Sequence, residues 1–148
     1  MTHQPFIPDV DERYVITRTI TLSSPVERVW RAISEAEEIA GWFPSKEAEL
    51  DSLEPGGKGI LTWTDYGSFP IVVEAVDPPT YLAWTWGHET DEQPTTLVEW
   101  RLEPTADGTL LTVTESGIKT PAHFAENSQG WDEELGELVD YLAGAVAS

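Results

Sequence analysis

The sequence of 148 residues predicts an α+β fold in which one antiparallel sheet packs against a long C-terminal helix. Between residues 46 and 116, β-rich segments follow one another across short turns, and short connections make consecutive strands antiparallel neighbours. No helical pattern separates these strands, which disfavours a doubly wound parallel sheet. Residues 131–146 carry an apolar stripe at helical spacing, and a sheet is the surface large enough to cover it.

The start of the chain predicts a tail followed by a strand. Residues 1–13 are polar and contain two prolines, which is typical of a flexible N-terminal tail. Residues 14–148 are expected to form a single domain, because a chain of 16.4 kDa has room for one hydrophobic core. The run 15–22 is rich in β-branched residues and predicts the first strand.

Two short helices are expected after this strand. Ser24 and Glu27 have the spacing of a capping box, with Pro25 at the first helical position. Ser34 and Glu37 repeat that spacing before a second helix, which the glycine at 41 ends.

The centre of the chain predicts a series of strands. Turn sequences with Gly, Pro and Asp bound them. Alternation along one of them puts Val98, Trp100 and Leu102 on the same face. The expected strands after the first cover residues 59–64, 69–76, 81–86, 96–102 and 109–116.

The longest helix is expected at the C-terminus, with Asn127 or Ser128 as its cap. Asp132, Glu133 and Glu134 lie in its first turns, where the helix dipole favours acids, and we expect them on its solvated side. The apolar stripe of this helix consists of Trp131, Leu135, Leu138, Val139, Leu142 and Val146.

The order of these elements resembles the helix-grip fold of the START-like (SRPBCC) superfamily. Five motifs resemble the family named after the activator of the Hsp90 ATPase: SSPVERVWRAISEAEEIAGWFP at 23–44, EPGGKGIL at 54–61, VDPPTYLAWTW at 76–86, TTLVEWRLEPTADGTLLTVTESGI at 95–118 and GWDEELGELVDYLA at 130–143. The resemblance covers residues 14–143. It implies a curved antiparallel sheet of six to seven strands wrapped around the long C-terminal helix, with a cavity between them.

Such a cavity usually holds an apolar ligand, so the resemblance implies a carrier or sensor of a small apolar, aromatic or lipid-like molecule. The alternative is an enzyme like the polyketide cyclases and dehydratases of the superfamily, which would use a carboxylate in the pocket. A second alternative is a co-chaperone-type interaction module. A chaperone partner is disfavoured, because the eukaryotic namesake also relies on a separate N-terminal domain. Whether the chain is an enzyme stays open.

Alternation and helical spacing select the side chains that would line the cavity. Packing of the core explains aromatic residues at these positions equally well, although Trp adds a flat surface and one N–H for a ligand. The predicted ligand-binding residues are Trp42, Phe43, Trp63, Trp84, Trp86, Trp100, Val113, Glu115, His123, Trp131, Leu135 and Leu138.

Charged residues on apolar faces are the second prediction, because a buried charge needs a partner. Glu115 shares a face with Leu111 and Val113 and is the candidate for a catalytic base or for orienting a ligand hydroxyl. Arg18 and Glu74 are the other expected buried polar residues. The alternative is a structural ion pair or a strand end that reaches solvent.

Composition excludes several classes of partner and cofactor. The net charge of −19 disfavours nucleic acid and anionic membranes. No apolar run reaches the length of a membrane span, and no signal peptide is visible, so a cytoplasmic protein is expected. Without cysteine and without a spaced His motif, we expect no metal site and no cofactor. A homodimer is compatible with the sequence.

Overall fold

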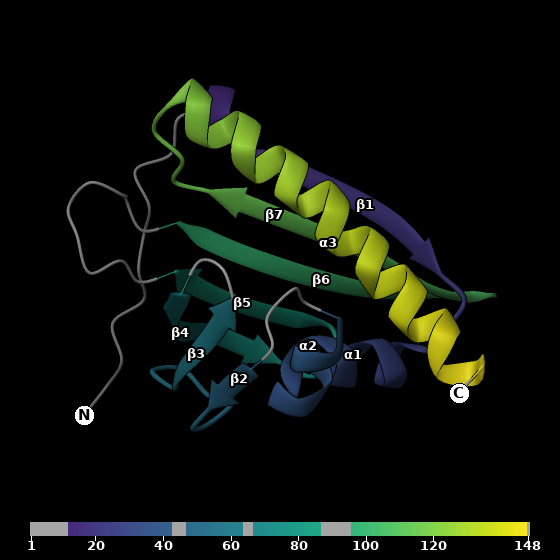
Figure 1. Cartoon of the computed structure of the whole chain (residues 1–148). Coiled ribbons are helices and arrows are strands. Elements are labelled where there is room, and N and C mark those ends of the chain that lie inside the picture. The colour runs from purple at the N-terminus through teal and green to yellow at the C-terminus, as the bar shows by residue number, and fades with distance from the viewer. Residues whose placement is uncertain (1–11, 43–46, 64–66, 87–95, 148) are drawn as a thin grey trace.

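The computed structural model describes residues 12–42, 47–63, 67–86 and 96–147 and has the expected helix-grip architecture (Figure 1). Its elements in chain order are η1 (Glu12–Tyr14), β1 (Ile16–Leu22), α1 (Val26–Ser34), α2 (Ala36–Trp42), β2 (Glu47–Leu50), β3 (Lys58–Trp63), β4 (Gly67–Asp77), β5 (Tyr81–Trp86), β6 (Leu97–Thr105), β7 (Gly108–Ser116) and α3 (Pro121–Ala147).

Seven strands form one antiparallel sheet in the order β1-β7-β6-β5-β4-β3-β2. Every strand after β1 pairs with its neighbour in the chain, whereas β1 pairs with β7. Helix α3 runs diagonally over β1, β7 and β6, and α1 and α2 lie near its C-terminal end (Figure 1). The three helices therefore enclose the inner face of the sheet.

The strand register sets which inner-face side chains lie side by side. One row of paired residues crosses five neighbouring strands. In the order of the strands it consists of Val73 on β4, Trp84 on β5, Val98 on β6, Glu115 on β7 and Ile16 on β1. All five are at most 3% exposed. One buried row across five strands thus consists of four apolar residues and one acid.

Neither capping box forms, because other groups begin the first two helices. Pro25 is the N-cap of α1, and its carbonyl oxygen accepts from Arg28 and Val29. The Ser34 hydroxyl donates instead to the carbonyl of Trp30, one turn back, over 2.6 Å. The expectation of serine caps was therefore wrong, because Pro25 takes the N-cap position of α1 and the Ser34 hydroxyl bonds to the preceding turn.

Helix α3 begins earlier than its predicted caps. It starts at Pro121, and the Thr120 hydroxyl caps it by accepting from the His123 amide over 3.1 Å. Asn127 therefore lies inside the helix, with its side chain free to bond elsewhere. Of the stripe, Trp131, Leu135, Leu138 and Leu142 are buried as expected, whereas Val139 is 41% exposed, and the side chain of Val146 lies outside the described residues.

Glu38 joins all three helices at the C-terminal end of α3. Its carboxylate accepts from Arg28 of α1 over 3.0 Å and from the Tyr141 hydroxyl of α3 over 2.5 Å. Burial disfavours the charge, but these two donors outweigh burial and hold the pKa of Glu38 below its ordinary value. Gly41 makes the contact possible, because a Cβ there would lie 2.7 Å from the Tyr141 ring.

None of the helices in the described ranges is both long enough and apolar enough to cross a membrane.

Gly136→Ala is expected to raise the free energy of unfolding by about 0.5–1 kcal/mol, because glycine weakens a helix interior. Gly136 is exposed in α3, and a Cβ there meets no atom within 4 Å. Urea denaturation measures the change.

Gly108→Ala should lower the free energy of unfolding by about 2 kcal/mol or more, since its Cβ would lie 2.0 Å from the Leu22 carbonyl oxygen. Equal effects of the two variants would contradict the assignment.

Candidate ligand-binding site

Four tryptophans form a continuous row inside the fold, which we call the tryptophan row: Trp86, Trp84, Trp100 and Trp131. Ring centroids are 6.0 Å apart from Trp86 to Trp84, 5.8 Å from Trp84 to Trp100 and 5.5 Å from Trp100 to Trp131. The first three come from β5 and β6 and the last from α3. The row therefore crosses from the sheet to the helix, and its neighbouring rings are tilted or edge-on to one another, with interplanar angles of 78°, 56° and 77°.

The indole N–H groups of this region divide into bonded and unbonded ones. Trp42 donates to the carbonyl of Ala32 over 2.7 Å and packs edge-on against Trp100. Trp131 donates to Glu115 over 2.9 Å. The Nε1 atoms of Trp84 and Trp100 are buried and have no hydrogen-bond partner in the part of the chain that the structure describes. Two strong donors inside the fold are therefore left over.

Glu115 lies at the α3 end of the tryptophan row and is only 3% exposed. One carboxylate oxygen accepts from the Thr96 hydroxyl over 2.6 Å. The other accepts from Trp131 over 2.9 Å and from the Asn127 amide over 3.3 Å. Burial raises the pKa of Glu115, and its three donors oppose the rise without cancelling it. The alternation that predicted an acid inside the fold is therefore correct at this residue.

Glu134 is a second acid near the site; it is half-buried, whereas the sequence analysis expected it on the solvated side of the helix. It follows Trp131 by three residues and precedes Leu138 by four, so it shares the buried side of α3. Burial raises its pKa to about 8, and the nearby charges of Glu115 and Glu133 add to the rise. The helical spacing to Trp131 and Leu138 was the signal that could have found it. We call Glu115 and Glu134 the acid pair.

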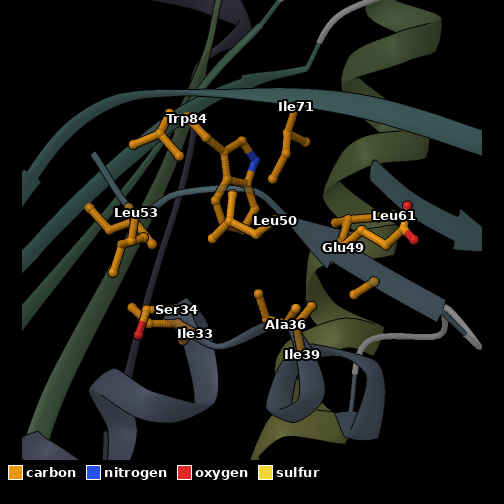
Figure 2. A pocket seen from close by; sticks show the side chains of 13 residues that line it. Ile33, Ser34, Ala36, Ile39, Glu49, Leu50, Leu53, Leu61, Ile71 and Trp84 are labelled. Carbon is orange, nitrogen blue, oxygen red and sulfur yellow. The ribbon is translucent and has the colours of Figure 1, made fainter. Parts of the chain in front are cut away.

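A hollow next to Trp84, the Trp84 hollow, lies between the inner face of the sheet and the first two helices. Residues of α1, α2, β2, β3, β4 and β5 line it, with Leu53, and nearly all of its lining is apolar. Figure 2 shows the Trp84 ring projecting into it, with Ile33, Ala36 and Ile39 on the opposite side. Its empty space is about 310 Å³, part of it open to solvent.

The remaining predicted site residues have different positions. Val113, Leu135 and Leu138 are buried in the core, and His123 is half-buried in the first turn of α3. Phe43 and the side chain of Trp63 lie outside the described residues.

Arg18 and Glu74 do not enter the interior site. Arg18 is on the expected face but half-buried. Its guanidinium pairs with Asp132 of α3 over 2.7 Å, so the two residues form an ion pair at the solvent-exposed edge of the interior. Glu74 is the extra residue of a β-bulge between Val73 and Ala75. It is buried, but it accepts from Thr85, whose side chain is on the face opposite to that of Trp84.

No three His, Asp or Glu side chains of the described ranges come together as a metal site would require.

The curved sheet, the enclosing helices and the aromatic interior with its acid define a helix-grip protein of the START-like superfamily. The family model for activator of Hsp90 ATPase homolog 1-like proteins matches residues 23–143, and the chain belongs to this family. A search of curated proteins finds no match.

Solved structures share this fold. Protein MLL2253 from Mesorhizobium loti is 23% identical with a TM-score of 0.78, over 87% of this chain and 96% of its own. CalU16 from Micromonospora echinospora is 27% identical with a TM-score of 0.70, over 90% and 77%. DynU16, a protein in the dynemicin biosynthetic locus, is 27% identical with a TM-score of 0.75, over 88% of this chain. The chain spans about half of DynU16, 47% of its length.

Glu134→Gln is expected to stabilise the protein at pH 9 by about 1–2 kcal/mol, since water screens a half-buried charge in part. Burial raises the folded-state pKa from 4.5 to about 8. Folding therefore favours the protonated acid, and the wild type loses stability as pH rises from about 4.5 to about 8. The variant should lack this part of the loss, and urea denaturation at pH 5 and pH 9 measures the difference.

Glu137→Gln is the matched control, because Glu137 is exposed on the same helix and is not among the charges that raise the pKa of Glu134. It removes the same charge and should leave the pH dependence of Glu134 nearly unchanged. If both variants flatten the pH profile equally, overall charge and not burial explains it.

Thr96→Val is expected to destabilise the protein by about 1–3 kcal/mol, because the buried Glu115 carboxyl loses a hydrogen-bond partner. Urea denaturation measures the change. Thr19→Val is the control, since the Thr19 hydroxyl is exposed and bonds across the outer face to Thr112. Equal losses in the two variants would contradict a special role of the buried Thr96–Glu115 bond.

Proposed function

We propose that the protein binds a small apolar, aromatic or lipid-like molecule between the sheet and α3, as a carrier or sensor. The observation that supports this most directly is the pair of buried indole N–H groups of Trp84 and Trp100, which have no partner in the described ranges. A buried donor without an acceptor costs about 1–3 kcal/mol. An acceptor atom of a bound molecule would remove that cost.

The proposed site combines the tryptophan row, the acid pair beside Trp131 and the Trp84 hollow, which Trp84 alone of the row lines. Aromatic and apolar walls with a few convergent polar groups are typical of small-molecule sites. The enclosed part of the hollow has room for about one water molecule. A larger ligand therefore has to separate α2 from the sheet when it enters.

A second candidate function is an enzyme of the cyclase or dehydratase kind. The observation that favours it is the acid pair, because a carboxyl with a pKa of about 8 can hold and release a proton near neutral pH. The position of the relative DynU16 in a biosynthetic locus agrees with such a role. Glu134 would then be the proton donor or acceptor and Glu115 its neighbour.

Native mass spectrometry of freshly purified protein tests ligand binding. We expect a reproducible additional mass that denaturation releases. Glu115→Gln should retain less of this mass, because the variant changes the polar end of the site. Glu99→Gln is the control, since Glu99 bonds to Tyr81 and Arg101 on the outer face. Protein without any bound mass, and without a change of tryptophan fluorescence on adding apolar aromatic compounds, would contradict the proposal.

The released compound also separates the two candidate functions. Incubated again with the protein, it should return unchanged from a carrier. A new mass in liquid chromatography would favour the enzyme.

A further inference from the structure

We infer that the ligand is a neutral carbonyl compound with an apolar body, a ketone or an ester, whose carbonyl oxygen accepts from the indole N–H of Trp84 inside the Trp84 hollow. The inference rests on the proposed binding function and names the chemical class of its ligand. Three observations carry it: the unused donor of Trp84, the apolar surroundings of that donor, and the charge of the lining.

The unused donor belongs to a residue that lines the hollow. Trp84 is 2% exposed, and its Nε1 is buried without a hydrogen-bond partner among the described residues. Figure 2 shows the indole ring projecting into the hollow, with its nitrogen on the side of Ile71, which is also part of the lining. An indole N–H can only donate. What the interior lacks at this point is therefore an acceptor.

The surroundings of this donor make water a poor partner for it. A buried water needs about two to four polar partners, and the lining offers only Ser34 and Glu49 besides Trp84. The Ser34 hydroxyl already donates to the carbonyl of Trp30 over 2.6 Å. Figure 2 shows the Glu49 carboxylate at the side of the hollow away from Trp84. A carbonyl oxygen suits the place better, because it accepts from one N–H and brings no donor of its own.

The charge of the lining selects a neutral ligand. No Lys, Arg or His is among the described residues that line the hollow, and the one charged residue there is Glu49. A carboxylate or phosphate ligand would enter without a counter-ion and would be repelled by this acid. An ammonium group has no acceptor to offer to the Trp84 N–H. A hydroxyl group accepts, but it also brings a donor that an aliphatic lining cannot accept.

The rest of the lining suits the apolar body of such a molecule. Aliphatic side chains make up most of it, and Ile33, Ala36 and Ile39 lie on the side opposite Trp84 (Figure 2). Because the enclosed part of the hollow has room for about one water molecule, the body has to push Ala36 and Ile39 of α2 away from the sheet. Binding in the hollow should therefore change the backbone amide signals of α2 in an NMR spectrum.

Three probes with the same pentyl chain separate the chemical classes. The first is 2-heptanone, the second is 2-methylhept-1-ene, in which a methylene group replaces the carbonyl oxygen, and the third is hexanoate, in which a charged oxygen replaces the methyl group. Two-dimensional ¹H–¹⁵N NMR of the wild-type protein follows the indole N–H groups. We expect the ketone to move the Trp84 indole proton downfield, because this proton gains an acceptor. The alkene, added to saturation, should change the α2 amides without this shift, and hexanoate should bind at least tenfold more weakly than the ketone.

Replacement of Trp84 by 3-benzothienylalanine removes the donor alone, because sulfur takes the place of the N–H in a ring of nearly the same shape. It identifies the Trp84 signal by its loss and should weaken binding of the ketone about tenfold. The same replacement at Trp30 is the control, since Trp30 is half-buried on α1 and does not line the hollow. It should leave the affinity for the ketone unchanged.

Failure of this inference differs from failure of the proposed function. A ketone that changes the α2 amides without moving the Trp84 indole signal would overturn the inference and leave the binding function standing; this comparison uses the wild type alone. Hexanoate that binds as tightly as the ketone, equal losses at Trp84 and Trp30, or a co-purified molecule without a carbonyl group would also overturn it. If no probe binds and purified protein carries no additional mass, the binding function itself fails.

Discussion

The structure depends on one constraint, which is that the Glu115 carboxyl needs hydrogen-bond partners inside an apolar row. Val98 and Ile16 flank it on the neighbouring strands, and neither offers a donor. The donors come from Thr96 and from two residues of α3, Asn127 and Trp131. These two bonds fix the position of α3 along its axis, while its apolar stripe fixes its rotation. Helix α3 therefore has to start upstream of Asn127.

Structural and binding roles are combined in the same side chains. Trp131 ends the tryptophan row with its ring and holds Glu115 with its N–H. A leucine there would fill space but would leave the carboxylate short of a donor. For this reason a stripe of aromatic residues in the sequence is equally compatible with a packed core and with the wall of a ligand site. What separates the two is the bonding capacity that packing leaves unused, at Trp84 and Trp100.

The sequence predicted the strands well because alternation and turn residues are local properties. The bounds of β5 agree with the expected 81–86, and alternation put Glu115 inside. Glu134 was missed because the acids of the first turns were assigned to solvent together, although its helical spacing to Trp131 and Leu138 separates it from Glu133. Glu74 is on the outer side because it directly follows Val73, which faces inward, and the bulge between Val73 and Ala75 then shifts the alternation for the rest of the strand. No residue pattern indicates that shift.

The two ends of α3 are fastened with unequal strength, and this gives the helix a direction of opening. At its N-terminal end, release would expose or strand a buried carboxylate, which is expensive. At its C-terminal end, the Tyr141–Glu38–Arg28 contacts lie near solvent, and water can replace them at small cost. We therefore expect local opening of α3 to begin near Tyr141, where the helix contacts α2, and α2 also lines the Trp84 hollow.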